Sequence, residues 1–231
     1  MELPQISVTS RLLLYCERLD GSFWGEPANA ISNAAFLIAA AAAFRLWWRT
    51  GGRDLAALAL IAVVVAVGFG SFAFHTLATP AAMLADVIPI AVFIYGYLLL
   101  ALRRFLGLSA TISVIVVIGY AAMTQALSVA APPELLNGSV AYLPALVALV
   151  AVATATSWRQ GTGQPWRELS RATIIFALSL LLRTLDRVSC DAVPLGTHFI
   201  WHLLNAVTLY ILLRAVITAA PAAVFARTKA D

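Results

Sequence analysis

Long apolar stretches make up most of the chain, and short polar segments separate them. Each stretch is close to the roughly 20 residues that an α-helix needs to cross the hydrocarbon core of a bilayer. The breaks carry residues typical of turns, such as Gly51-Gly52, Arg103-Arg104 and Pro132-Pro133. The pattern predicts an all-α fold, a single seven-helix transmembrane domain over residues 1–231. The predicted spans are about 27–48, 54–75, 81–102, 109–130, 139–158, 168–188 and 198–218, with 1–26 as a segment outside the membrane.

The composition supports this interpretation. Of the 231 residues, 62% are hydrophobic and 11% are charged, whereas soluble domains are about 45–50% apolar and about 25% charged. A soluble fold of this size could not cover so much apolar surface, so a soluble enzyme is excluded. The net charge of +4 is attributed to basic loops on one membrane face. No run of basic residues interleaved with aromatic residues is present, so nucleic acid is not an expected partner.

The basic residues also predict the orientation of the chain in the membrane. Eleven of the 15 basic residues lie in or beside alternate loops, or at the C-terminal end. They are Arg45, Arg49, Arg53, Arg103, Arg104, Arg159, Arg167, Arg171, Arg214, Arg227 and Lys229. Because loops rich in Lys and Arg stay in the cytoplasm, the N-terminus is predicted outside and the C-terminus inside.

Polar residues inside predicted spans are costly and indicate function. Five of them lie near the outer ends of their spans once the orientation is set: Ser71, His75, Asp86, His198 and His202. This set contains all three histidines of the chain. The topology therefore brings together, at one membrane face, residues that are scattered along the sequence.

The types and spacing of these residues favour a zinc site. His198 and His202 are four residues apart, so both rings lie on one helix face, and His75 would supply a third ligand from another helix. Three protein ligands with an open position are typical of catalytic zinc. Asp86 could accept a proton from activated water, and Ser71 lies one turn deeper than His75. Two alternatives are separate interfacial histidines and a haem, but His198 and His202 cannot lie on opposite faces of one iron.

The two cysteines, Cys16 and Cys190, both fall on the outer side of the predicted membrane. Because that side is oxidising, we expect a disulfide between them that ties the N-terminal segment to the loop before His198. Two buried free thiols are the alternative.

Several of these motifs resemble those of a known group of membrane hydrolases. Gly70-Ser71-x-x-x-His75, the later Asp86 and His198-x-x-x-His202 resemble the signature of the superfamily that includes alkaline ceramidases and the progestin and adiponectin receptors. Three further segments resemble the alkaline ceramidase branch in particular, and the similarity to this branch extends over nearly the whole chain. They are Tyr15-Cys16-Glu17, Glu26-x-x-Asn29-x-x-x-Asn33 and Asp186-x-x-x-Cys190.

The resemblance implies a zinc-dependent amidase in a bacterial inner membrane, with its site near the extracytoplasmic face. It would hydrolyse the amide of ceramide, or of a similar N-acyl lipid, to a sphingoid base and a fatty acid. His75, His198 and His202 match the zinc ligands, Asp86 the acid/base residue and Ser71 the serine beside the zinc. A membrane lipid is the expected partner, and no obligate protein partner is indicated.

The resemblance leaves two alternatives open. The first concerns calcium, for which Glu17 and Glu26 match two family ligands and Asp20 stands in for a third. However, Leu14 replaces an acidic residue and the loop is shorter, so these carboxylates could instead face water or pair with Arg18, Arg183 or Arg187. The second is a zinc-containing receptor of the adiponectin-receptor type with little hydrolysis. A transporter is disfavoured because no inverted repeat is present.

Overall fold

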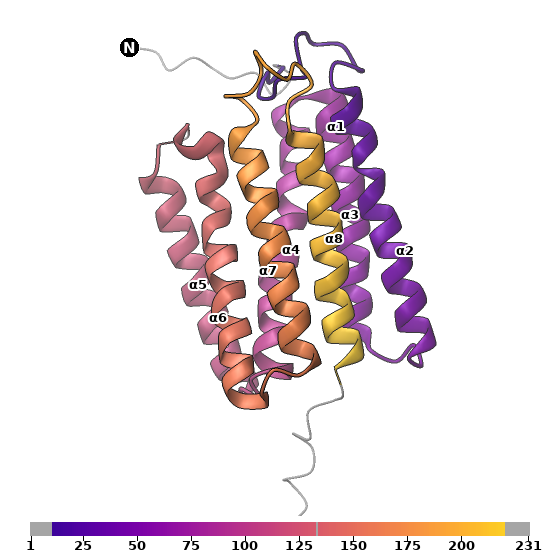
Figure 1. Ribbon diagram of the computed structural model, residues 1–231, viewed down its shortest axis with the longest axis vertical. Helices are drawn as coiled ribbons and strands as arrows, with labels where there is room; N and C mark the ends of the chain where they lie inside the picture. The colour runs from indigo at the N-terminus through magenta and orange to yellow at the C-terminus, as the bar shows by residue number, and fades with distance from the viewer. Residues whose placement is uncertain (1–10, 133, 220–231) are drawn as a thin grey trace, which may run out of the picture.

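The computed structural model describes residues 11–132 and 134–219, and all regular structure in these ranges is helical. The long helices run side by side along the long axis of the molecule (Figure 1). Their bounds are α1 Pro27–Ser32, α2 Ala34–Arg49, α3 Leu55–Leu77, α4 Pro80–Arg104, α5 Ala110–Ala130, the 3-10 helix η1 Leu135–Tyr142, α6 Leu143–Gln160, α7 Gln164–Leu185 and α8 His198–Thr218. The predicted all-α class is confirmed, and the predicted spans agree with these bounds to within a few residues. The first predicted span is divided at Asn33 into α1 and α2.

Within residues 11–132 and 134–219, six helical segments are long and apolar enough to cross a membrane, which indicates an integral membrane protein. They comprise α1 with α2, α3, α4, α5, η1 with α6, and α8. The segment predicted as the sixth span, α7, is not in this set because it carries Arg167, Glu168, Arg171 and Arg183. It nevertheless has 22 residues and lies between α6 and α8, with contacts to both (Figure 1).

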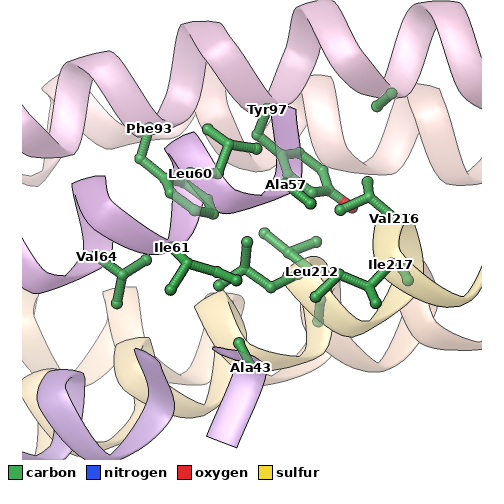
Figure 2. Packing of buried hydrophobic residues seen from close by; sticks show 14 of the residues in the cluster. Ala43, Ala57, Leu60, Ile61, Val64, Phe93, Tyr97, Leu212, Val216 and Ile217 are labelled. Carbon is green, nitrogen blue, oxygen red and sulfur yellow. The ribbon is translucent and has the colours of Figure 1, made fainter. Parts of the chain in front are cut away.

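Small and large apolar side chains pack together between the central helices α2, α3, α4 and α8. Figure 2 shows apolar side chains from α2, α3, α4 and α8 meeting between these helices. Ala43 and Ala57 are fully buried there, and their small side chains leave room for Leu60, Phe93 and Leu212. The outer surface is also apolar, and α5 has Ser113 as its one buried residue. Such a large exposed apolar surface is the kind that lipid covers.

A charged pair closes the end of the bundle opposite the N-terminal segment. Asp54 caps the start of α3 by accepting a hydrogen bond from the backbone N–H of Ala57 (3.1 Å). The Arg104 guanidinium at the end of α4 donates to both carboxylate oxygens of Asp54, at 2.5 and 2.6 Å. It also donates to the carbonyl of Val216 in α8 (2.8 Å). One arginine therefore joins the ends of three helices.

Gly70 allows α3 and α4 to touch through their backbones. A Cβ atom added at Gly70 would lie 2.0 Å from the carbonyl oxygen of Ala85 and 3.2 Å from the amide nitrogen of Asp86. Only glycine permits this approach, as in close helix pairs of other membrane proteins. The contact brings Ser71, the next residue of α3, beside Asp86 of α4.

We predict that Gly70→Ala separates α3 from α4 and destabilises the protein by about 1–3 kcal/mol, the usual cost of overpacking. Gly119→Ala in α5 is the matched control, because no heavy atom lies within 4 Å of the added Cβ there. Thermal unfolding in detergent would measure both. An unchanged melting temperature for Gly70→Ala would show that the two backbones are not in contact.

Candidate functional site

The three histidines of the chain meet at the end of the bundle that carries the N-terminal segment. His75 comes from the last turn of α3, and His198 and His202 come from the first two turns of α8. All three are buried, and one ligand atom from each lies within 4.8 Å of the others. The spacing of four residues places both α8 rings toward α3, as predicted.

The unpaired nitrogen atoms of this cluster fit a metal ion. His75 Nε2 and His198 Nδ1 are buried and have no hydrogen-bond partner among the described residues. Buried polar atoms are rarely left unpaired, because each costs about 1–3 kcal/mol. Three converging imidazoles, two of which carry an unpaired buried nitrogen atom, form a donor set that suits zinc.

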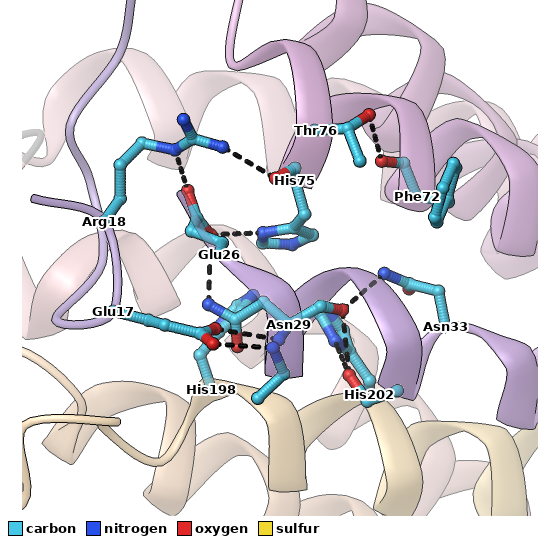
Figure 3. Close-up of polar contacts among 12 residues, drawn as sticks. Glu17, Arg18, Glu26, Asn29, Asn33, Phe72, His75, Thr76, His198 and His202 are labelled. Atoms are coloured by element: carbon cyan, nitrogen blue, oxygen red, sulfur yellow. Dashed lines mark hydrogen bonds and ion pairs between the residues drawn. The ribbon is translucent and has the colours of Figure 1, made fainter. Parts of the chain in front are cut away.

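Each of two histidines is oriented by a partner on its other nitrogen atom (Figure 3). Glu26 Oε2 lies 2.5 Å from His75 Nδ1, and Ser32 Oγ lies 2.8 Å from His202 Nδ1. Metal-binding histidines commonly have a carboxylate or hydroxyl partner in this position, because it sets the tautomer and the ring orientation. Glu26 immediately precedes the short helix α1 and Ser32 is its last residue, so this helix positions two of the three rings.

Arg18 connects the N-terminal segment to this arrangement. Its buried guanidinium forms an ion pair with Glu26 and donates to the carbonyl of His75 (2.6 Å). It also donates to the carbonyl of Ser22 (3.0 Å). Burial alone would raise the pKa of Glu26, but hydrogen bonds from His75, Arg18 and Asn29 hold this pKa below its usual value. Glu26 is therefore an ionised partner for His75.

A second buried carboxylate sets the start of α8. Asp186 is fully buried and accepts hydrogen bonds from the backbone N–H groups of Cys16 (3.3 Å), Thr197 (2.7 Å) and His198 (2.9 Å). A Cβ at Gly196, which has φ +69°, would lie 2.2 Å from Asp186 Oδ1. The loop before α8 can therefore pass this carboxylate only with a glycine at this position.

The predicted disulfide between Cys16 and Cys190 is present, with a Cα–Cα distance of 5.2 Å. It joins the N-terminal segment to the loop between α7 and α8, as expected from the outer placement of both residues. Together with Asp186, it fixes Tyr15, whose ring stacks on His198 at a centroid distance of 3.8 Å. The N-terminal segment thus covers the histidines.

Ser71 and Asp86 lie together on the inner side of the histidines. Ser71 follows Gly70, where α3 contacts the backbone of α4 at Ala85 and Asp86, so the Ser71 side chain lies near the Asp86 carboxylate. Asp86 Oδ1 is buried and has no partner among the described residues. Both side chains line the same cavity as His198 and His202. The structure therefore brings together the five residues that the topology placed at one end.

This cavity extends from the histidines into the apolar middle of the bundle. It contains about 1090 Å³ of space, including its open part, and side chains from α2, α3, α4, α6, α7 and α8 form its wall. On α8 it reaches from His198 to Leu212, about 20 Å along the axis at 1.5 Å per residue. Apart from the groups near the histidines, its lining is mainly apolar, as a site for a lipid chain requires.

The three carboxylates considered for calcium do not come together. Glu17 accepts hydrogen bonds from the backbone N–H groups of Ala28 (2.6 Å) and Asn29 (2.8 Å) at the start of α1. Asp20 is exposed and accepts one from the backbone of Ser22 (2.8 Å). Glu26 pairs with Arg18, which was the alternative to calcium. Within the described ranges, the histidines are the one group of acidic, Cys or His ligands close enough to hold a metal.

Three residues of the site were not assigned their roles from the sequence. They are Tyr15, which covers the histidines, Ser32 as the partner of His202, and Asp186 as the carboxylate at the start of α8. Arg18 was named only as one of three possible partners of the carboxylates considered for calcium. The role of Asp186 could have been inferred from the sequence, because an acidic residue near the end of a membrane span needs a polar partner. The roles of Arg18 and Ser32 depend on contacts with His75 and His202, which are distant in sequence.

These features define the class as a helical integral membrane protein with a buried three-histidine centre that opens into an apolar cavity. The model of the ceramidase family matches residues 12–223. The chain therefore belongs to the ceramidase family, and the resemblance inferred from its motifs is confirmed. No curated protein matches the chain. Family membership supports a hydrolase that acts on the amide bond of ceramide.

We predict that Glu26→Gln weakens the affinity of the three-histidine cluster for a metal ion, with zinc as the probe, by about 10- to 100-fold, because a neutral amide is a poorer partner for His75 than a carboxylate. Asp20→Asn is the matched control, since Asp20 is exposed and contacts only its own loop. Competition with a fluorescent zinc chelator would measure the affinities. Equal affinities for the two variants would exclude Glu26 as a partner of a metal ligand.

Proposed function

We propose that the protein is a zinc-dependent amidase that hydrolyses the N-acyl bond of ceramide, or of a similar N-acyl lipid, within the membrane. The observation that carries this proposal is the position of the three histidines. The three rings converge, two of them carry an unpaired buried nitrogen atom, and His198 and His202 line one end of an apolar cavity together with Ser71 and Asp86. A metal site, a proton acceptor and a channel for a lipid chain therefore meet at one place.

The proposed ligands of the zinc are His75, His198 and His202. When bound, zinc supplies Lewis acidity that lowers the pKa of water and polarises a carbonyl group. The three rings are already oriented by α1 and the N-terminal segment, so little rearrangement is needed for binding.

Asp86 and Ser71 have separate roles in the proposed reaction. Asp86 accepts a proton from the attacking water and returns it to the nitrogen atom of the leaving amine. The unpaired Oδ1 of Asp86 is free for this transfer. Ser71 donates a hydrogen bond to the oxyanion that develops from the amide carbonyl. The close approach of the helices at Gly70 keeps the two side chains on the same side of the substrate.

The cavity determines how the substrate lies. The amide is placed beside the histidines, and the headgroup lies toward the N-terminal segment. The acyl chain runs along α4, α6 and α8 toward Leu212 and Tyr97. Burial of the chain in an apolar channel requires no extraction of the lipid into water.

We further propose that α7 is a seventh span, that the N-terminus is outside and that the site lies near the extracytoplasmic face of a bacterial inner membrane. The basic residues near the end of the bundle opposite the histidines support this orientation. Arg227 and Lys229, which contributed to the prediction, lie outside the described residues.

Purified protein should release fatty acid from a labelled ceramide, and a chelator should abolish the release. Asp86→Asn should retain zinc but reduce kcat by at least about 100-fold, because proton transfer is lost. His202→Ala should lose zinc and activity together, because one of three ligands is removed. Metal analysis and a fatty acid assay would give both quantities for each variant.

Two outcomes would contradict this proposal. Full activity of His202→Ala would exclude a reaction that depends on the three-histidine site. Bound zinc without any chelator-sensitive release of fatty acid would instead favour a receptor built on the same fold.

Labelling of single introduced cysteines tests the topology. Thr162 lies in the loop between α6 and α7, Ala192 lies between α7 and α8, and both are exposed. In intact cells, an impermeant maleimide should label Ala192→Cys but not Thr162→Cys, which should react only after the membrane is opened. Equal labelling of the two positions in intact cells would show that α7 does not cross the membrane.

A further inference from the structure

Asn205 introduces a polar group into the part of the cavity where an acyl chain would lie. It is on α8, three residues beyond His202, and both side chains line the cavity. Residues three apart share a helix face, so Asn205 lies about 4.5 Å deeper than His202 along the axis. The lining beyond it on α8 is Thr208, Leu209 and Leu212.

Ser179 of α7 engages only one end of the Asn205 amide. The buried hydroxyl of Ser179 lies 3.2 Å from Asn205 Oδ1 and 3.1 Å from the carbonyl oxygen of Trp201. A hydroxyl has one hydrogen atom, so it donates to only one of these groups at a time. In either arrangement, Ser179 satisfies the nearer half of the amide, and the other half forms no hydrogen bond within the described ranges.

The chemistry of the free half indicates what it binds. If Ser179 donates to Asn205, the amide NH2 faces the cavity. If Ser179 donates to Trp201, the amide can turn, so that its NH2 contacts Ser179 and its oxygen faces the cavity. An alcohol hydroxyl suits both cases, because it donates and accepts. An unsatisfied amide in an apolar channel is costly, so a polar partner on the ligand is favoured.

We propose that Asn205 is a specificity-determining residue that binds a substrate hydroxyl group within a few carbon atoms of the scissile amide. This inference rests on the proposed amidase function. Asn205 lies on the inner side of the histidines, where the acyl chain begins, so a hydroxyl at carbon 2 or 3 of that chain is the favoured source. The hydroxyl at carbon 3 of the sphingoid base is the other source of the same chemistry.

The test compares kcat/KM for dodecanoyl, 2-hydroxydodecanoyl and 3-hydroxydodecanoyl ceramides, and for a dodecanoyl ceramide that lacks the 3-hydroxyl of the base. The unmodified protein should prefer a hydroxylated chain by about tenfold, the size of one hydrogen bond in a buried site. Asn205→Leu should remove this preference and retain hydrolysis of the plain chain. A preference that instead follows the hydroxyl of the base, and is lost in Asn205→Leu, assigns the bond to that source.

Thr208→Val is the matched control, because Thr208 also lines the cavity but its hydroxyl already donates to the carbonyl of Leu204 (2.9 Å). It should leave the preference unchanged. Equal kcat/KM values for all four lipids in the unmodified protein would overturn the proposal, as would a preference that survives Asn205→Leu.

A binding measurement separates this proposal from the proposed reaction. In detergent, 2-hydroxydodecanoate or 3-hydroxydodecanoate should raise the melting temperature more than dodecanoate, or sphingosine more than its 3-deoxy analogue, and Asn205→Leu should remove the difference. If no ceramide is hydrolysed but this difference is found, the amidase function fails and Asn205 is still a hydroxyl-binding residue. If no hydroxylated ligand, the 2-hydroxy acid included, differs from its counterpart without the hydroxyl, Asn205 does not bind a hydroxyl.

Discussion

Three imidazole rings are buried at one end of an apolar helix bundle, and the contacts around them are arranged to accommodate this burial. Buried nitrogen atoms that lack a hydrogen-bond partner cost free energy, yet within the described residues only some of these ring nitrogen atoms have a partner. Glu26 and Ser32 occupy one nitrogen of His75 and one of His202. One buried nitrogen atom of His75 and one of His198 have no partner among the described residues. The outer contacts orient the rings, and the free atoms define the site.

Two further features maintain this arrangement. The N-terminal segment is held by Arg18, by the disulfide and by Asp186, so it closes the end of the bundle over the histidines. On the inner side, the backbone contact at Gly70 brings α3 to α4 and places Ser71 near Asp86. The histidines therefore remain open only toward the apolar cavity, which suits a ligand with a long chain. The same few contacts therefore determine where the histidines, Ser71 and Asp86 lie and from which side a ligand can reach them.

Much of this could be predicted from the sequence, because hydropathy and charge act over whole segments. Seven helical segments follow from the lengths of the apolar stretches, and alternate basic loops place five polar residues at one end. The break at Asn33 was not predicted, because α1 and α2 together read as one apolar span. α7 was predicted as a span on length, although its charged residues separate it from the other six in composition.

Roles that depend on distant contacts could not be predicted. Ser32 and His202 are 170 residues apart, as are Cys16 and Asp186. Of the long-range contacts made by the N-terminal segment, only the disulfide was expected. A cysteine on the outer side of a membrane commonly pairs with another cysteine, and both cysteines of this chain were predicted on that side. Arginine, serine and asparagine side chains can pair with many kinds of group, so the sequence around Arg18, Ser32 and Asn205 did not distinguish their roles.

Zinc-edge X-ray absorption on the purified protein directly tests the proposed metal centre. We predict one zinc ion per chain with three imidazole nitrogen ligands at about 2.0 Å and one oxygen ligand. Absence of zinc after purification in zinc-containing buffer, or a spectrum with fewer than three imidazole ligands, would contradict it.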